Sequence, residues 1–383
     1  MARPHLALLE LAAGRSLPKF DDGARLVASA VEHQMAGLLL RRLDNGEIRL
    51  EPVLERDLTA ISLLTQERHR RLTRALADVS ERLQSTGIDV ATFKGITAEM
   101  RWYDGMGDRP CADVDLLVAP HDLHRVGELA ELLEPGHRLD ARAVRRLVAE
   151  GAIQSLDFRI DGVAIDVHFD LFKLGYPGRQ PEVIWSRTVP VALPEGGRTR
   201  MLDPELSFVH FLLHLNRDKF RSLLGYTDIA RILDREVLDW DFIDRFVRSE
   251  GLETQHSLTL EAVVDTLGLP RANGAGATGW RAGIWRIAWR PKTRLLGDVA
   301  AIRYMRRGPL LLPLLVHGRG RAAVRYWLRR LFPPAAVIDI KHPGTNGPYL
   351  WRLITGRIGQ TGERAVDRLA AHKTVSRKNG AKT

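Results

Sequence analysis

Apolar residues recur every three or four positions in two stretches near the start of the chain, residues 23–42 and 52–86. This spacing places them on one face of a helix. In the second stretch Pro52 suits a first helical turn, and Gly87 suits the position that follows the last turn. We therefore expect residues 1–87 to form an N-terminal helical segment.

The pattern then changes to short runs of β-prone residues. The runs that predict strands are residues 88–93, 112–118, 153–160 and 163–169. The last two flank Asp161-Gly162, a dipeptide that readily adopts the positive φ angles of a tight hairpin turn. Helical stretches at 96–103 and 120–134 separate the earlier strands. Residues 88–200 are therefore expected to form a small mixed α/β core.

Helical spacing returns at Asp203, which suits an N-cap and is followed by Pro204 at the first helical position. The predicted helices that follow are residues 206–216, 222–233, 241–249 and 253–267. Together they predict a helical domain over 201–272. We expect a basic region rich in Trp and Arg over 273–370, and a disordered tail over 371–383.

Composition limits the class of protein. A chain of 383 residues with 45% hydrophobic residues can bury a core in two or three domains. Its single cysteine, Cys111, excludes a disulfide framework and any site with several cysteines. The N-terminus carries His5 and Glu10 within its apolar part, and the longest apolar run, 309–316, is too short to cross a bilayer. We therefore expect a cytoplasmic protein without a transmembrane segment.

The net charge of +10 conceals a division along the chain. Residues 1–270 carry more acidic than basic side chains, whereas residues 271–383 carry a large excess of Lys and Arg. The basic part can attract phosphates, nucleic acid or an anionic surface. Its alternating Trp and Arg residues also suit base stacking. However, Trp285 and Trp289 have the spacing of one buried helical face, and we favour core packing with solvated arginines.

The residues that point to chemistry begin with Asp113 and Asp115. In a strand they share one face, roughly 6.6 Å apart, while Val114 and Leu116 face the other side. Two carboxylates so placed can hold one divalent ion, or bracket two ions as phosphoryl chemistry needs. By chance alone such a pair should occur about six times in this chain, so an edge strand with two solvated acids explains it equally well.

A third carboxylate changes this balance. The run 163–169 places Ala164, Asp166 and His168 on one face. If that strand lies beside Asp115, three carboxylates converge and repel one another unless a cation lies among them. Magnesium suits such a site, because it prefers oxygen ligands and keeps positions for water and phosphates.

Several segments of the chain form a linked series of motifs. They are Phe93-Lys94-Gly95, Arg109, Asp113–Val118, Ile165–His168, Leu224–Leu233, Asp239-Trp240 and, more loosely, Leu331–Pro334. This series resembles the uncharacterised nucleotidyltransferase family of the DNA polymerase β-type nucleotidyltransferase superfamily, over roughly residues 30–340.

This resemblance implies an α+β protein: a nucleotidyltransferase-fold core flanked by an N-terminal helical segment and a C-terminal helical domain. It implies two Mg²⁺ ions, or Mn²⁺, and transfer of an NMP from an NTP to a small-molecule or protein acceptor with release of pyrophosphate. Asp113 and Asp115 then resemble paired metal ligands, and Asp166 a third that also helps to deprotonate the acceptor. Gly95 resembles the glycine of the strand-to-helix turn, where backbone N–H groups approach the triphosphate.

Other side chains are candidates for binding the nucleotide. Lys94 and Arg109 could neutralise phosphate oxygens, and Thr97 offers a hydroxyl near Gly95. His168 suits either an orienting or substrate-binding role or a strand histidine capped by the backbone. Lys219 could reach a phosphate from the helical domain, although a solvated lysine is the simpler interpretation.

Two further features favour structural interpretations. His210 and His214 have the i, i+4 spacing of metal ligands, but a third ligand is not evident, so packing is favoured. Asp228 is expected to buttress a helix.

Two alternatives to this enzyme remain open. One is a catalytically inactive protein of the same fold that binds RNA or an anionic surface through residues 271–383. The other is a nucleotidyltransferase that acts on RNA ends.

Overall fold

The computed structural model describes residues 4–136, 139–173, 178–218, 220, 222–270 and 331–341, with a few single positions beyond residue 280. The chain divides into two compact units, residues 1–325 and 326–383. The second contains the helix α17 (Ala335–Lys341). Lys219, the tail 371–383 and most of the predicted basic region lie outside the described residues, so the predictions made for them stay predictions.

Most of residues 4–85 are helical, and the helices beyond residue 22 lie where the spacing of apolar residues predicted them. The helices are α1 (Pro4–Ala12), α2 (Gly23–Glu32), α3 (Ala36–Asp44) and α4 (Pro52–Ser85). The stretch 23–42, which the pattern predicted as continuous, breaks at Gln34, where φ is +61°. The prediction for α4 is confirmed at both ends: Pro52 is in its first turn, and Gly87, with φ +72°, follows its C-terminal cap.

A six-stranded mixed sheet follows, with the strand order β3-β4-β2-β1-β6-β5. The strands are β1 (Val90–Phe93), β2 (Val114–Val118), β3 (Ser155–Ile160), β4 (Val163–His168), β5 (Thr188–Ala192) and β6 (Arg198–Leu202). Strand β4 runs parallel to β2, and β6 parallel to β1; the other neighbours are antiparallel. The predicted hairpin is confirmed, with φ +50° at Asp161 and +77° at Gly162.

The last two strands were not predicted from the sequence. Strand β5 lies at the edge of the sheet, is largely exposed and contains Pro190. Proline cannot donate to a ladder and is tolerated at an edge, so the usual strand signal is weak there.

Short helices connect the strands. These are α5 (Gly95–Trp102), the 3₁₀ helix η1 (Pro120–Arg125), α6 (Val126–Leu133), α7 (Ala141–Ala149) and α8 (Pro181–Ser186). The stretch predicted as one helix over 120–134 therefore begins with a 3₁₀ segment, and α7 and α8 were not predicted.

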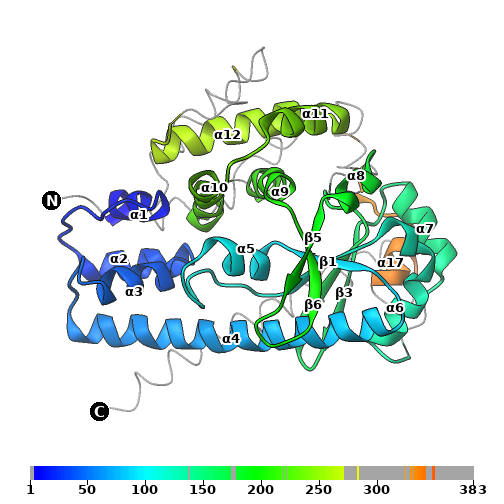
Figure 1. Cartoon of the computed structure of the whole chain (residues 1–383), viewed down its shortest axis with the longest axis horizontal. Helices are drawn as coiled ribbons and strands as arrows, with labels where there is room; N and C mark the ends of the chain where they lie inside the picture. The colour runs from blue at the N-terminus through cyan, green and yellow to red at the C-terminus, as the bar shows by residue number, and fades with distance from the viewer. Residues whose placement is uncertain are drawn as a thin grey trace. The chain divides into compact units, whose positions relative to one another are not determined.

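Four helices complete the part that surrounds the sheet: α9 (Pro204–Arg217), α10 (Leu223–Arg235), α11 (Trp240–Glu250) and α12 (Glu253–Leu267). The N-cap predicted at Asp203 is confirmed, because its carboxylate accepts a hydrogen bond from Leu206 N at 2.9 Å. Figure 1 shows α5 between α4 on one side and α10 on the other, and the contacts among these helices agree.

One buried hydrophobic cluster joins the helices before and after the sheet. It includes residues of α1–α3 and α9–α12 together with Phe93 of β1 and Leu117 of β2. Helix α4 contacts β2, β4 and β6. The expected α+β class, with a mixed α/β core flanked by helices in the sequence, is confirmed.

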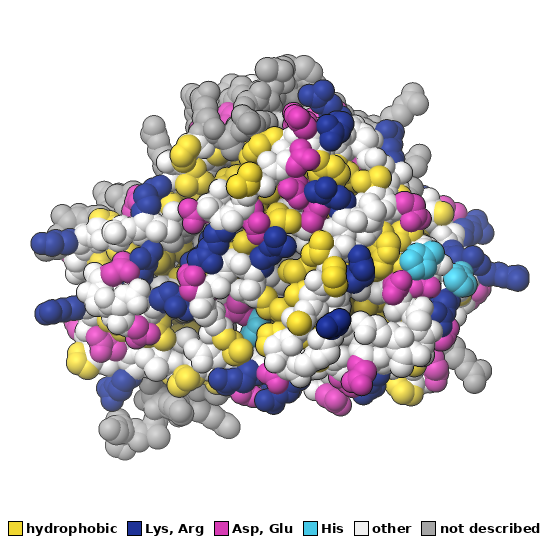
Figure 2. All heavy atoms as spheres, in the orientation of Figure 1, with side chains coloured by type: hydrophobic (Ala, Val, Ile, Leu, Met, Phe, Trp, Pro, Cys, Tyr) yellow, Lys and Arg dark blue, Asp and Glu magenta, His cyan; other side chains and the backbone are white. Residues whose placement is uncertain are grey.

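Among the described helices, none is both long enough and apolar enough to cross a membrane. Figure 2 shows basic and acidic side chains interspersed on the face drawn, with apolar atoms between them. That face therefore carries charges of both signs rather than a field of one sign.

Candidate active site

The parallel pairing of β2 with β4 brings two of the predicted carboxylates together. Asp115 lies opposite Asp166 in the register, and Leu117 lies opposite His168. Since side chains alternate between the two faces of a strand, Asp115, Asp166 and His168 share one face. One ligand atom from each lies within 4.8 Å of the others. Asp113 directly precedes β2 and interacts electrostatically with both carboxylates.

Burial makes the negative charges of this site costly. Asp115 is 4% exposed. Burial, together with the nearby charge of Asp115, raises the pKa of Asp113 to about 6. Burial would also raise the pKa values of Asp115 and Asp166, but neighbouring cationic and hydrogen-bonding groups outweigh it and lower both.

Those neighbours are two lysines and a histidine. Lys94 forms an ion pair with Asp115 and lies 3.3 Å from His168 Nε2. Lys173 Nζ donates to Asp166 Oδ2 at 2.9 Å. Lysine ammonium groups thus already contact two of the three carboxylates.

His168 lies between the carboxylates. Its Nε2 is 3.1 Å from Asp115 Oδ1 and 2.9 Å from Asp166 Oδ2, and the ring is fully buried. Asp166 Oδ1, in contrast, is a buried atom without a hydrogen-bond partner in the described part of the chain. One acceptor position of the site is therefore unsatisfied.

The backbone at Lys94 is held in a conformation that few lysines adopt. Its φ is +64° and its ψ is −124°, at the cap position between β1 and α5. Such a conformation costs about 1–3 kcal/mol in a residue other than glycine and is found most often at functional sites. It accompanies the ion pair between this lysine and Asp115.

Gly95 begins α5, and its packing explains why a glycine is needed. A Cβ atom at this position would lie 2.9 Å from Cys111 Sγ and 3.3 Å from Arg109 Nη1. The next candidate, Thr97, is buried, and its hydroxyl donates to the carbonyl oxygen of Lys94 at 3.0 Å. The nucleotide-binding roles of both residues stay predictions.

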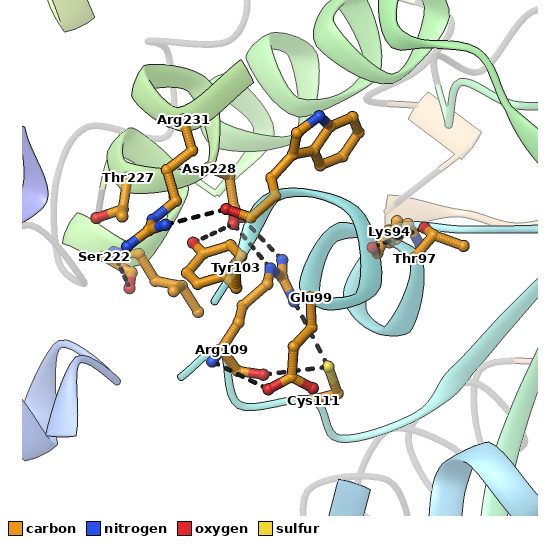
Figure 3. Close-up of polar contacts among 12 residues, drawn as sticks. Lys94, Thr97, Glu99, Tyr103, Arg109, Cys111, Ser222, Thr227, Asp228 and Arg231 are labelled. Carbon is orange, nitrogen blue, oxygen red and sulfur yellow. Dashed lines mark hydrogen bonds and ion pairs between the residues drawn. The ribbon is translucent and has the colours of Figure 1, made fainter. Parts of the chain in front are cut away.

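Arg109 lies in a separate buried network, which Figure 3 shows. Its Nε and Nη2 donate to the two oxygens of Asp228 at 2.7 and 2.8 Å. The hydroxyl of Tyr103 donates to Asp228 Oδ1 at 2.7 Å. The guanidinium of Arg109 is therefore paired with a carboxylate of α10, and its phosphate-binding role stays a prediction.

Comparison with known proteins identifies the family. A family model described as "Uncharacterised nucleotidyltransferase" matches residues 21–268. The chain belongs to this uncharacterised nucleotidyltransferase family. The match includes every strand of the sheet and the helices α2–α12, so the predicted resemblance is confirmed. Neither a curated protein nor a solved structure matches the chain.

Helix α9 carries two histidines, of which His210 is buried and His214 is partly exposed. His210 is 5% exposed, and both of its ring nitrogens lack a hydrogen-bond partner in the described part of the chain. The ring packs edge-on against Phe93, with centroids 5.1 Å apart. Burial lowers the pKa values of His210 and His214 well below the usual value, so both are neutral at pH 7.

These two histidines do not form a metal site with a third ligand. The described groups with suitable metal-ligand spacing include neither His210 nor His214. The packing interpretation of their spacing therefore agrees with the structure.

The sequence offered no signal for one member of the site, Lys173. It lies seven positions after Asp166, in the segment that follows β4. The repulsion among three carboxylates predicts that some cation must lie nearby. It cannot say which of the many lysines and arginines of the chain supplies one.

Proposed function

We propose that this protein is a metal-dependent nucleotidyltransferase that transfers an NMP from an NTP to a small-molecule or protein acceptor and releases pyrophosphate. Membership of the nucleotidyltransferase family supports the reaction class. The observation that carries the proposal is the in-register pairing of Asp115 with Asp166, with Asp113 beside them.

The residues present fit a divalent cation. Asp113, Asp115 and Asp166 offer carboxylate oxygens, the ligands that Mg²⁺ and Mn²⁺ prefer. The partnerless Asp166 Oδ1 and the raised pKa of Asp113 both indicate negative charge that the described side chains do not fully compensate. A bound ion would polarise the α-phosphate and stabilise the charge that develops on the leaving group.

Asp166 would hold the ion and orient the acceptor beside it. Its Oδ2 is occupied by Lys173 and His168, whereas Oδ1 has no hydrogen-bond partner among the described residues. Because the pKa of Asp166 is lowered, in the proposed reaction the acceptor O–H, made more acidic beside the ion, gives its proton to a solvent water as its own oxygen bonds to the α-phosphorus. The bond from the α-phosphorus to the bridging oxygen breaks, and pyrophosphate leaves with that electron pair.

The positively charged side of the site suits the triphosphate. Lys94 and Lys173 carry ammonium groups, and the first turn of α5 has backbone N–H groups that favour an anion. His210 and His214 are neutral and have N–H groups to donate. Arg109 holds the loop before β2 against α10, which keeps Asp113 at its position.

Turnover of labelled NTPs tests the proposal. The wild-type protein is incubated with Mg²⁺ or Mn²⁺ and with fractionated cell extract, and the fraction that acquires label is identified. Asp113→Asn should abolish Mg²⁺-dependent NTP consumption and leave the thermal midpoint nearly unchanged, because the amide keeps the shape of the side chain.

Asp234→Asn, at an exposed position of α10, is the matched control and should keep full activity. The proposal is wrong if the wild-type protein neither binds nor consumes any NTP in the presence of either metal. The RNA-binding and RNA-end alternatives depend on residues 271–383, most of which lie outside the described part, and stay predictions.

A further inference from the structure

We infer that the site holds one divalent cation, and that Lys94 and Lys173 supply the positive charge that a second ion would otherwise bring. The inference rests on the proposed function and specifies how its site differs from the two-ion arrangement that the family resemblance implied. It follows from the contacts of the two lysines and from the balance of charge.

Each lysine contacts a different carboxylate of the pair. Lys94 binds Asp115, and Lys173 Nζ is 2.9 Å from Asp166 Oδ2. Their side chains are 12% and 28% exposed, so neither ammonium group is fully solvated. Electrostatic interactions of this kind are stronger in such surroundings than in water.

The charges balance with one ion rather than two. Three ionised carboxylates with two divalent ions leave one net positive charge, which suits a triphosphate. Three carboxylates with two ammonium groups and one divalent ion leave the same single positive charge. A second ion added to the lysines would leave three positive charges in a confined space.

The positions of the carboxylate oxygens also agree with one bound ion rather than two. Asp115 Oδ1 contacts both Lys94 and His168 Nε2, and Asp166 Oδ2 contacts both Lys173 and His168 Nε2. Asp166 Oδ1 has no hydrogen-bond partner among the described residues. The ligand atoms that lie within 4.8 Å of one another come from Asp115, Asp166 and His168, with Asp113 as a charged neighbour, and this single group suits one ion.

The backbone conformation of Lys94 indicates that its ion pair with Asp115 is a fixed part of the structure. A positive φ is unfavourable for lysine, yet it accompanies the ion pair with Asp115. Its ammonium also lies 4.9 Å from the centre of the Phe93 ring, a cation–π contact that favours the same position.

Counting bound Mn²⁺ tests the inference without measuring activity. The metal-free full-length protein is dialysed against increasing Mn²⁺, and bound ion is measured per chain. The wild-type protein should bind one ion tightly. The double variant Lys94→Met/Lys173→Met should bind two, and the first of them on the order of tenfold more tightly, because two nearby positive charges are gone.

Lys19→Met, at an exposed position, is the control for general loss of charge and should bind one ion as the wild type does. A second double variant, Lys94→Gly/Lys173→Gln, guards against misfolding, since glycine accepts the positive φ of residue 94 without strain. It should also bind two ions.

Two tightly bound ions in the wild type would overturn the inference and leave the proposed transfer intact. A single ion in both double variants would overturn it as well, because the lysines would then not take the place of an ion. A chain that binds no Mn²⁺ and consumes no NTP would contradict the proposed function itself.

Discussion

Two buried ion clusters lie close together at the N-terminal half of α5, and they differ in how completely their polar atoms are paired. Around Arg109 and Asp228, both carboxylate oxygens accept from the guanidinium, and Tyr103 adds a third hydrogen bond. Around Asp115 and Asp166, one buried oxygen has no partner in the described chain, and two lysines approach from different elements. Complete pairing indicates a structural cluster, and incomplete pairing indicates a place for a ligand.

Another group that could hold a metal belongs to the structural cluster. His69, Glu99 and Cys111 have ligand atoms within 4.8 Å of one another. However, Glu99 pairs with His69 and accepts hydrogen bonds from the backbone N–H groups of Gly107 and Arg109. Burial raises the pKa of Cys111 to about 12, which opposes the thiolate that a metal would require.

The largest loss of stability is expected when a charged partner is removed from the fully paired cluster around Arg109 and Asp228. Arg109→Met leaves the buried Asp228 without its charged partner and should lower the free energy of unfolding by about 3–5 kcal/mol. Urea unfolding followed by circular dichroism measures the loss.

The double variant Arg109→Met/Asp228→Leu removes both charges and should be more stable than the single variant. This cycle also tests the phosphate role predicted from the sequence for Arg109. If NTP consumption disappears while stability is unchanged, Arg109 binds substrate and our assignment of a positioning role is wrong.

Outside both clusters, a buried histidine without an ionic partner should make the stability of the protein depend on pH. His33 is fully buried, its Nδ1 accepts a hydrogen bond from Leu223 N at 3.2 Å, and burial lowers its pKa to about 4. Because this pKa is lower in the folded state than the usual 6.5, the contribution of His33 to stability is complete above pH 6.5. It is lost as the pH falls from 6.5 to about 4, by about 3 kcal/mol in all.

His33→Asn keeps an acceptor that cannot titrate. The stability difference between wild type and variant, measured by urea unfolding, should therefore shift in favour of the variant as the pH falls. His121→Asn, at an exposed histidine, is the control. Parallel pH curves for wild type and His33→Asn would contradict the prediction.

Gly95 links the two clusters, and a methyl group there should disturb both. Gly95→Ala places a Cβ 2.9 Å from Cys111 Sγ, so the free energy of unfolding should fall by about 1–3 kcal/mol. Cys111→Ala in the same chain removes the sulfur and should restore part of the loss. Thermal unfolding of the single and double variants measures this, and an equal loss in both would rule out the sulfur as its cause.

The smallest effect is expected at Thr97. Thr97→Val loses one hydrogen bond, from its hydroxyl to the carbonyl oxygen of Lys94, and should cost about 1 kcal/mol of stability. The KM for NTP should change little if that bond is the only role of the hydroxyl. A several-fold rise in KM with unchanged stability would instead assign Thr97 to the nucleotide.

The positions of the site's strands could be predicted from the sequence more accurately than the pairing of the strands or the position of the edge strand. Short β-prone runs located β1, β2 and β4 to within a few residues, because the signal for a buried strand is local. The sequence did not predict that β4 lies beside β2, and the three carboxylates were expected to meet only if it did. Parallel pairing depends on contacts between residues that are far apart in the sequence. The edge strand β5, with its exposed residues and Pro190, carried too weak a pattern.

Which charged side chains pair with each other was the hardest feature of the structure to predict from the sequence. Arg109 and Asp228 are 119 positions apart, and each could have paired with many other groups. Lys94 was identified as a residue of interest by its motif, but its positive φ and its contact with Asp115 depend on the folded sheet. The motif therefore located the site, and tertiary structure determined which charges meet there.

The length of α4 has a consequence for how the protein unfolds. Its 34 residues span about 51 Å at 1.5 Å per residue. The same helix contacts α2 and α3 near its start and α6 and three strands of the sheet elsewhere. Neither group of elements can separate from it without exposing apolar surface, so the N-terminal helices and the sheet should melt together. Calorimetry should then record a single cooperative transition for both.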